Sequence, residues 1–559
     1  MATDIGELCG RLLADLGADV VRVEPPGGSA SRQGRSGYFA TRNFNKRSVC
    51  ADLSSPEGRA RMAGLLSGAD VWIETSRPGG LAGVGLDPAE VVGRYSRLVV
   101  ASMTDFGLTG PYRDWVATDA VLVGMAGGLF RSGVIEHPPL LPPGTLAYDV
   151  AGMMGAFAIL SALWQRESTG RGQHLDVSAL ESMAQISDWS LPNFSAIRAA
   201  GGSYNEVRSG SGIVYPMYPC ADGYVRLVIL SPRQWHSLRA WLGEPEILQS
   251  DYFDSLLGRI SIQDILDPMF REFFSTWGMA DLSAEAQRRG IVMTPVLHPD
   301  AVLVSDHFVA RGSFVETEVE PGVRGLVASG VFEINGGRAG LRERAPWVGE
   351  HDGEAGEIER SWTAAAEAAE AAAGGAGGAG GAGASAGPGP GPGAGAGAGA
   401  VAGAGPALPF SGLLVLDFGH GGVGVEAGRL FAEYGADVVK IESRAYPDFI
   451  RLVSGSEMSA SFASSSRSKR SFGVNIKTDE GLALVRRLVT LADVVIENNS
   501  TGTMDDVGLG YRVLRELNPR LVMVSSQLMG STGPWADWLG YGPSTRPAGG
   551  MTWLWNFPG

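Results

Sequence analysis

The sequence predicts an α/β protein with parallel sheets, arranged as two related copies of one unit. Two observations support this fold class. Short runs rich in Val and Ile alternate with segments of helix length, which is typical of βαβ units. In addition, the stretch GRLLADLGADVVRVEPPGG at residues 10–28 has a close copy, GRLFAEYGADVVKIESRAY, at residues 428–446. This repeat indicates that the chain folds the same unit twice.

The elements of the first copy follow a regular order. Small and apolar residues on one face of residues 10–16 predict a helix, and Gly17 predicts the turn that ends it. Three apolar runs then predict strands, namely ADVVRVE at 18–24, ADVWIE at 69–74 and RLVVASM at 97–103. The uncharged run from Val150 to Trp164 predicts a buried core helix, because it is shorter than the ~20 residues that span a membrane.

The second copy keeps the register of the first. Gly17 returns as Gly435, 418 positions later, and Lys46 returns as Lys469, 423 positions later, so one five-residue insertion separates the copies. The second copy begins with an additional strand-like run, LLVLDFG at residues 413–419, whose counterpart would fall almost entirely before Met1. We therefore expect the first copy to lack the first strand of the fold.

The segment between the copies, residues 362–409, consists mainly of Gly, Ala and Pro. It contains almost no side chains that could form a core. This composition predicts a disordered linker, with a short helix where Ala and Glu are enriched at its start. The linker separates the first copy from the second, which occupies residues 410–559.

Composition and charge restrict the classes of partner and site. The 559 residues are 44% hydrophobic, which is enough for roughly two or three domains. The net charge of −15 argues against nucleic acid and membranes as partners. Three cysteines and seven histidines show no metal-ligand spacing, so we expect no metal site. Sparse cysteines and the lack of a signal-peptide pattern predict a cytoplasmic protein.

One motif points to a nicotinamide cofactor. Residues 419–424, GHGGVG, match the G-x-G-x-x-G fingerprint, follow the predicted strand and open a helix, and Glu442 ends the next strand. The first copy has Met1 to Gly6 at that place, without the glycine pair. An NAD-binding oxidoreductase is therefore an alternative that the first copy does not support.

From about Gly10 to Gly353 the chain resembles the class III CoA-transferase family, which includes formyl-CoA transferase, carnitine CoA-transferase and α-methylacyl-CoA racemase. The motifs that carry the resemblance occur in the expected order: LLADLGADVVRVEPPGG, NKRSVCADLSSPEG, DVWIETSRPGGLAGVGLD, FGLTGPY, YDVAGMMGAFAILSALWQRESTGRGQHLDVSALES and APWVGEH. The second copy carries the early motifs and then stops.

The resemblance implies a Rossmann-type large domain with a parallel sheet and an inserted smaller α+β domain. On this sequence, the large domain would occupy residues 1–200 and 291–355, and the small domain residues 201–290. A truncated second large domain would follow at residues 410–559. Family members typically form interlocked dimers, so we expect such a homodimer, or a pseudo-dimer of the two copies within one chain.

Asp149 directly precedes the apolar helix and has two interpretations. As an N-cap residue, its carboxylate would accept backbone N–H groups of the first turn. The resemblance implies a second role, as the nucleophile that attacks an acyl-CoA thioester, forms a mixed anhydride and then an aspartyl-CoA thioester, and passes the CoA to a carboxylic acid. A helix N-terminus favours an ionised carboxylate, so the two roles are compatible.

The resemblance also implies the residues that bind CoA, whose phosphates need Arg, Lys and backbone donors. The family's phosphate-binding arginine corresponds to Arg32, and Arg451 is its counterpart in the second copy. Two loops match those that line the nucleotide, and they contain Ala51, Asp52, Leu53, Ser54, Thr75, Ser76 and Arg77. Coenzyme A enters as the thioester substrate, and we expect no permanently bound cofactor.

The neighbours of Asp149 favour CoA transfer over racemisation. Racemase members use a His before this Asp and a Glu in the small domain, whereas Thr118 and Ser231 stand there in this sequence. Racemisation needs a base and a proton donor on opposite sides of the α-carbon. We therefore predict a transferase that acts on an acyl-CoA and a carboxylic acid, with an α-methylacyl-CoA racemase-like enzyme as the alternative.

The register would place the nucleophile of the second copy at position 572, 423 residues after Asp149, and the sequence ends at Gly559. We expect this copy to contain a nucleotide-binding half without a complete active site. It would belong to a longer tandem protein or act as a structural or regulatory remnant. A non-catalytic CoA-thioester-binding protein built from degenerate copies is a further alternative.

Overall fold

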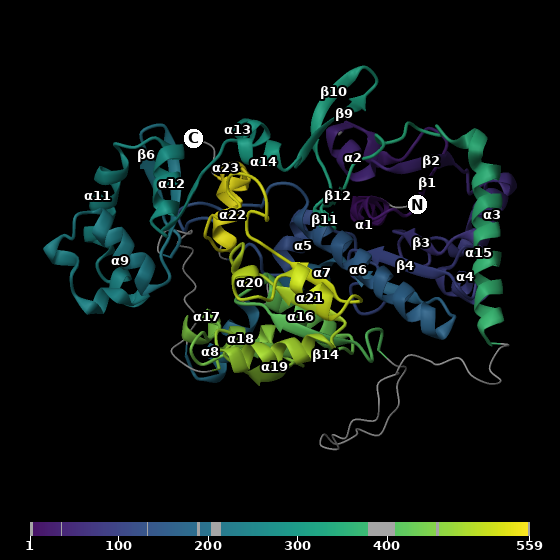
Figure 1. Cartoon of the computed structure of the whole chain (residues 1–559). Coiled ribbons are helices and arrows are strands. Elements are labelled where there is room, and N and C mark those ends of the chain that lie inside the picture. Colours follow the sequence, from purple (N-terminus) through teal and green to yellow (C-terminus); the bar gives the residue numbers. More distant parts are fainter. Residues whose placement is uncertain are drawn as a thin grey trace.

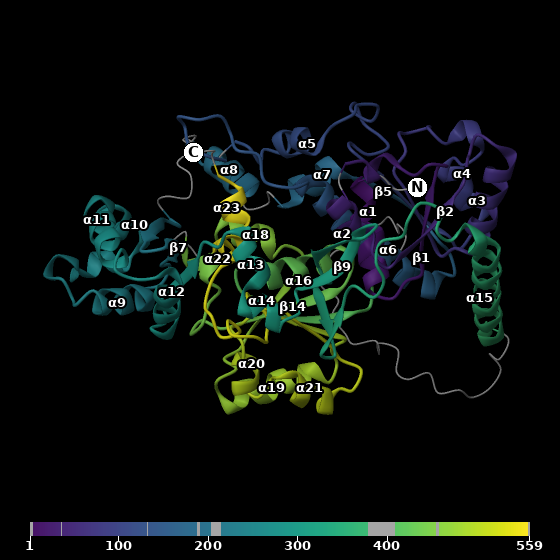
Figure 2. The ribbon, with the colours of Figure 1, turned by 90° about the horizontal axis from the view of Figure 1, so that it is seen from above.

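Two α/β units and one smaller domain make up the protein, as seen in a computed structural model (Figure 1). The structure describes residues 4–34, 36–130, 132–186, 190–202, 214–377, 408–453 and 458–556. In two perpendicular views, the second copy, coloured green to yellow, lies between the small domain and the sheets of the first copy (Figure 2). The predicted α/β class with parallel sheets and a partial second domain is confirmed.

The second copy contains a five-stranded parallel sheet of order β15-β14-β13-β16-β17. Its strands are β13 Leu414–Phe418, β14 Asp437–Glu442, β15 Arg470–Gly473, β16 Val494–Glu497 and β17 Val522–Ser525. The strand predicted at residues 413–419 is therefore confirmed, and it is the central one. Val415, Leu416 and Phe418 of this strand are buried, as is usual for a parallel strand covered on both faces.

In the first copy, the described residues form two parallel sheets instead of one. β1 Val20–Glu24 pairs with β2 Lys46–Cys50, and β3 Val71–Glu74 pairs with β4 Val99–Thr104, which also pairs with β5 His174–Ser178. The repeat equates β1 and β3 with β14 and β16, the two strands that flank β13. Between β1 and β3 lies a cavity of about 800 Å³, at the place that β13 fills in the second copy. Within the described residues, the expected lack of a first strand is confirmed.

The helices α1 Asp4–Asp15 and α6 Leu146–Thr169 pack against each other beside β4. Small residues permit this contact, since a Cβ added at Gly152 would lie 3.0 Å from Leu8 Cβ. Within the described part of the chain, α6 alone is long and apolar enough to cross a membrane, and half of its apolar window is buried in the protein. The other helices of this part are α2 Ser36–Asn43, α3 Pro56–Gly68, α4 Pro88–Arg94, α5 Asp119–Met125, α7 Ala179–Ile186 and α8 Ser190–Ala199.

The small domain has an antiparallel sheet of order β6-β7-β8 with its own core around Trp235, Phe274 and Leu282. Its elements are β6 Met217–Cys220, β7 Gly223–Val228, α9 Pro232–Trp241, α10 Leu256–Ile260, α11 Gln263–Phe274, α12 Met279–Arg288 and β8 Val292–Pro295. We expected the large domain to resume at residue 291, but residues 292–295 form β8 of the small sheet. β8 stays in the small sheet because its buried residues pack against α12 and pair with β7.

After β8 the chain returns to the first large domain. Helices α13 Pro299–Val304 and α14 Asp306–Ala310 come first, and His307 of α14 contacts Met529 and Trp535 of the second copy. The elements that return are β9 Phe314–Glu320, β10 Val323–Ala328, β11 Phe332–Ile334, β12 Gly337–Ala339 and α15 Ala355–Gly377. The β9–β10 hairpin packs on α2, and α15 packs on α3, where a Cβ at Gly68 would lie 2.5 Å from Thr363 N. Helix α15 therefore extends past residue 362, the expected start of the linker, and residues 378–407 lie outside the described residues.

The second copy contacts the first copy and the small domain. Its helices are α16 Val423–Glu433, α17 Phe449–Val453, α18 Ala460–Ser465, α19 Asp479–Val489, α20 Thr503–Asp506, α21 Tyr511–Leu517, α22 Gly542–Ala548 and α23 Met551–Leu554. Helix α22 packs on β7 and β8, and Leu297 N donates to Pro547 O at 3.0 Å. Phe157 of α6 meets Phe410 and Tyr434 edge-on. The two copies thus share apolar and hydrogen-bonded contacts within one chain.

Candidate active site

Asp149 lies inside the first turn of α6 instead of before the helix. The helix begins at Leu146, with Thr145 as the N-cap residue. The backbone N–H of Tyr148 donates to the Asp119 carboxylate of α5 at 3.0 Å, so a carboxylate from another helix accepts a free N–H group of this first turn. The N-cap interpretation of Asp149 is therefore wrong, because the helix starts four residues earlier than the apolar run suggests. The carboxylate of Asp149 sits where the helix N-terminus favours an anion.

A buried arginine from α2 pairs with this carboxylate. Arg42 Nη2 lies 2.5 Å from Asp149 Oδ1 and donates to Thr145 Oγ1 at 2.7 Å. The guanidinium covers the ring of Tyr38, 4.1 Å from its centroid, and the Tyr38 hydroxyl hydrogen-bonds Thr145 Oγ1 at 2.9 Å. The Arg42 side chain is 9% exposed, whereas that of Asp149 is 34% exposed. The carboxylate therefore has an accessible side and a side that faces a buried cation.

Sequence reasoning did not identify Arg42. Its signal in the sequence is weak: it lies three residues after the buried Phe39, and residues spaced by three share a helix face. An arginine on an inward helix face needs an acceptor, but the sequence does not show that Asp149, more than a hundred residues later, supplies it.

Two opposing effects act on the protonation of Asp149. Burial raises the pKa of Asp149, and the Arg42 charge and hydrogen bond act in the opposite direction. The nearby Asp119 carboxylate adds to the increase. Arg42 therefore favours the ionised form that nucleophilic attack requires.

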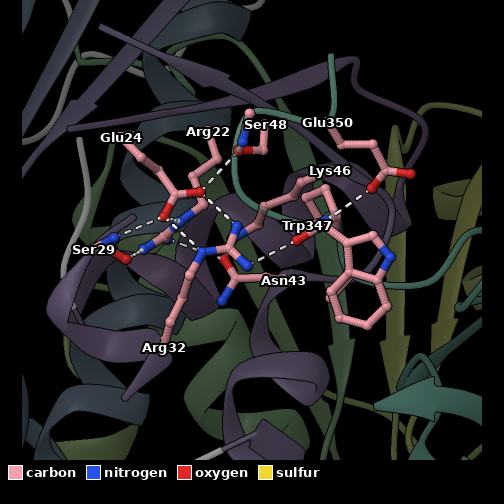
Figure 3. Close-up of polar contacts among 12 residues, drawn as sticks. Arg22, Glu24, Ser29, Arg32, Asn43, Lys46, Ser48, Trp347 and Glu350 are labelled. Carbon is pink, nitrogen blue, oxygen red and sulfur yellow. Dashed lines mark hydrogen bonds and ion pairs between the residues drawn. The ribbon is translucent and has the colours of Figure 1, made fainter. Parts of the chain in front are cut away.

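Arg32, the expected phosphate-binding arginine, belongs to a polar cluster around Glu24 (Figure 3). Its Nε and Nη2 donate to Glu24 at 2.9 and 2.5 Å, its Nη1 donates to Pro346 O at 2.9 Å, and its guanidinium lies over the Phe39 ring. Burial raises the pKa of Glu24, but Arg32 and Arg22 outweigh this effect and lower that pKa to about 2. In this structure, all three guanidinium nitrogens of Arg32 donate to protein acceptors.

The same constellation recurs in the second copy. Arg451 Nε donates to Glu442 at 2.6 Å, and its guanidinium lies 3.5 Å from the centroid of the Phe462 ring. The predicted correspondence between Arg32 and Arg451 therefore holds for their local geometry. Their binding of a CoA phosphate stays a prediction.

The two predicted nucleotide loops follow the carboxyl ends of β2 and β3. Asp52 Oδ1 accepts from Ser54 N at 2.9 Å and from Ser54 Oγ at 2.6 Å, which lowers the pKa of Asp52. Ser76 N donates to Glu74 Oε2 at 2.8 Å. The remaining members of these loops are Ala51, Leu53, Thr75 and Arg77. Ligands of α/β sheets bind at the carboxyl ends of the strands, so this position suits the predicted role without testing it.

The glycine-rich loop at residues 419–424 is already filled by protein groups. Gly421 N donates to both carboxylate oxygens of Asp448 at 3.0 and 3.1 Å, and His420 N donates to Asn498 Oδ1 at 2.7 Å. A Cβ at Gly421 would lie 2.3 Å from the Phe449 ring. A pyrophosphate would have to displace the buried Asp448 carboxylate, so the geometry argues against a dinucleotide at this loop.

In this chain, the two positions that hold the His and Glu of racemases lie at the start of helices. Thr118 is the N-cap residue of α5, and Ser231 caps α9 in a capping box with Gln234. Neither hydroxyl is a base at neutral pH. Across the residues that the structure describes, no group of three or more His, Cys, Asp or Glu side chains could hold a metal ion.

Comparison with known proteins identifies the family. The description "CoA-transferase family III" matches residues 4–352 and 410–559. A protein named "Probable CoA-transferase" from Mycobacterium tuberculosis is 38% identical over 560 residues, which cover 98% of this chain and 66% of the relative. The chain thus spans slightly less than two thirds of that relative's length. Alpha-methylacyl-CoA racemase from Homo sapiens is 30% identical over 360 residues, which cover 62% of this chain and 88% of the racemase.

A solved structure agrees with this result. The crystal structure of a CAIB/BAIF family protein from Brucella suis matches with a TM-score of 0.56 at 29% identity, and the match covers 63% of this chain and 95% of that one. The motifs, the sheet order and both matched segments point the same way, and this chain belongs to CoA-transferase family III.

Proposed function

We propose that the protein transfers CoA from an acyl-CoA thioester to a carboxylic acid, with Asp149 as the nucleophile. The observation that carries this proposal is the pair of Asp149 and Arg42, in which a partly exposed carboxylate is held by a buried cation at a helix N-terminus. Family membership supports CoA-transferase chemistry in general. The covalent route through Asp149 is the specific part of the proposal.

In the proposed reaction, an Asp149 carboxylate oxygen bonds to the thioester carbon, and the CoA thiolate leaves to give a mixed anhydride. The thiolate then attacks the Asp149 carbonyl carbon and releases the donor acid as its carboxylate. The resulting aspartyl-CoA thioester is attacked by the acceptor carboxylate, and the thiolate takes up the acceptor acyl group. Charge is conserved in every step, and Asp149 carries the negative charge beside Arg42 at the start and at the end of the cycle.

Racemisation is the second candidate, because one relative is named a racemase. It would need a base and an acid on opposite sides of the α-carbon. Thr118 and Ser231, which occupy the positions of the racemase His and Glu, cannot supply them. The geometry therefore favours transfer.

We place the CoA nucleotide at the loops after β2 and β3, with Arg32 and Arg451 as phosphate-binding candidates of the two copies. The contacts of α22 with β7 and β8 favour a pseudo-dimer, in which the second copy acts as the partner of the first within one chain. An interlocked homodimer is the alternative arrangement. We place the protein in the cytoplasm, with no nucleic acid or membrane partner, because the chain is acidic and has few cysteines.

The test loads the protein with a panel of acetyl-, propionyl- and succinyl-CoA and searches for acyl or CoA adducts by intact mass and peptide mapping. We expect an adduct on Asp149 that hydroxylamine removes, and no adduct in Asp149→Asn. Asp119→Asn, in a neighbouring carboxylate that serves the same helix turn, is the control and should still form the adduct. If turnover occurs but no donor ever labels Asp149, the covalent route is wrong. Unchanged binding without turnover would favour the non-catalytic CoA-thioester-binding alternative.

A further inference from the structure

Arg42 is a buried cation whose contacts make it dependent on an anion. Its side chain is 9% exposed, and its guanidinium lies over the Tyr38 ring and donates to Thr145. These two neighbours are neutral, and the carboxylate that it contacts is Asp149 at 2.5 Å. A buried guanidinium that loses its anionic partner strongly destabilises its surroundings.

The proposed function, on which this inference rests, removes that partner during each turnover. When Asp149 becomes an anhydride or a thioester, its carboxyl group is neutral. Arg42 then faces an accessible space without a negative charge on Asp149. At the thioester stage, the next species to arrive at the Asp149 carbonyl carbon is the acceptor carboxylate. Its oxygens must come within hydrogen-bond reach of Arg42 Nη2, because that atom already touches Asp149 Oδ1.

We propose that Arg42 binds the carboxylate of the acceptor acid and thereby selects carboxylic acids over neutral nucleophiles. The bound carboxylate oxygen bonds to the Asp149 carbonyl carbon, and the CoA thiolate leaves. The thiolate then bonds to the acceptor acyl carbon, and the freed Asp149 carboxylate returns to Arg42. Atoms and charge balance at each step, and the guanidinium keeps its protons throughout.

The second copy provides an internal comparison. Helix α18 corresponds to α2, and its packing residue is kept, since Phe462 is buried like its counterpart. At the position of Arg42, however, the second copy has Ser465, and at that of Tyr38 it has Ser461. The described part of this copy also reaches no counterpart of Asp149. The packing residue Phe39 is therefore repeated as Phe462. Tyr38 and Arg42, which lie beside Asp149, are replaced by serines in the second copy.

The experiment separates acceptor recognition from the rest of the reaction. Wild-type protein and Arg42→Gln are loaded with the donor from the panel that labels Asp149, and free donor is removed. The adduct is then discharged with acetate, propionate or succinate, or with hydroxylamine as a neutral nucleophile. We expect Arg42→Gln to discharge to carboxylates about 100-fold more slowly, and to hydroxylamine at nearly the wild-type rate. Arg42→Lys keeps the positive charge but lacks the paired N–H groups of the guanidinium, and it should recover part of the rate of discharge to carboxylates.

Arg166→Gln is the matched control, because Arg166 is equally buried at 9% exposure and pairs with Asp70, away from Asp149. It should leave both discharge rates unchanged. Equal slowing of both nucleophiles in Arg42→Gln would show a purely positioning role and overturn the proposal, and so would unchanged carboxylate discharge. If Arg42→Gln does not fold, the test uses Arg42→Lys, in which the ratio of the discharge rate with carboxylates to that with hydroxylamine should be lower than in wild type. Failure of wild-type protein to load would instead refute the proposed function.

Discussion

The burial of Lys46 predicts how the stability of the protein changes with pH. The repeat provides a comparison, because it places a lysine at the equivalent position of the second copy in a different environment. Lys46 Nζ is buried and donates to Glu7 O at 2.7 Å and Asn43 Oδ1 at 2.8 Å. Lys469, its counterpart, donates to the Asp417 carboxylate at 2.7 Å. Asp417 belongs to β13, the strand that separates β14 from β16. Burial lowers the pKa of Lys46 to about 7, even though Glu7 acts in the opposite direction.

The proposed substitution is Lys46→Met, which keeps most of the length of the side chain and removes the charge. Folded Lys46 loses its proton near pH 7, whereas the unfolded chain keeps it to about pH 10.5. Between these values the unfolded state binds more protons, so the stability of wild-type protein rises with pH. Wild-type stability minus Lys46→Met stability should therefore rise by about 1.4 kcal/mol per pH unit above pH 7. The full difference over this window is on the order of 5 kcal/mol.

The assay is urea unfolding of both proteins at pH 7, 8 and 9, followed by circular dichroism. Titrating groups that do not interact with Lys46 cancel in the difference. Cys9 does interact with Lys46, but burial raises the pKa of the Cys9 thiol to about 12, so that it stays protonated from pH 7 to 9. Lys469→Met is the matched comparison and should destabilise at every pH, because it leaves the buried Asp417 carboxylate unpaired. A stability difference between wild type and Lys46→Met that stays constant from pH 7 to 9 would show that folded Lys46 keeps its proton over this range.

Two further predictions concern a tight turn and the contact between the copies. Gly58→Ala places a Cβ 2.0 Å from Asp52 O and should lower the melting temperature by several degrees, whereas Gly83→Ala, which meets open space, should change it little. His307 stacks on Trp535, accepts from its backbone N–H at Nδ1 and donates to Met529 O from Nε2. Burial lowers the pKa of His307, so the folded state binds fewer protons below pH 6.5 and this contact weakens on acidification. Limited proteolysis at pH 5.5 and 7.5 should release the second copy faster at the lower pH, and equal rates would contradict this reading.

Features that depend on the local pattern of residues could be predicted from the amino-acid sequence. Alternating apolar runs identified the strands, and the repeat identified β13 and the equivalence of Arg32 with Arg451. These predictions succeeded because strand periodicity and register are properties of adjacent residues. The motifs around Asp149 also led to the family that the comparisons identified.

Contacts between residues far apart in the chain could not be predicted in this way, because they form only in the folded protein. Only folding brings Arg42 of α2 to Asp149 of α6, and only the close approach of Asp448 fills the glycine loop. Pairing with β7 placed β8 in the small sheet, although its apolar run could equally enter the large one. The protonation of Lys46 also depends on its surroundings. Lys469 donates to a carboxylate in the second copy, whereas Lys46 donates to neutral oxygens in the first. Burial and charge partners are set in three dimensions, and with them the chemistry of the site.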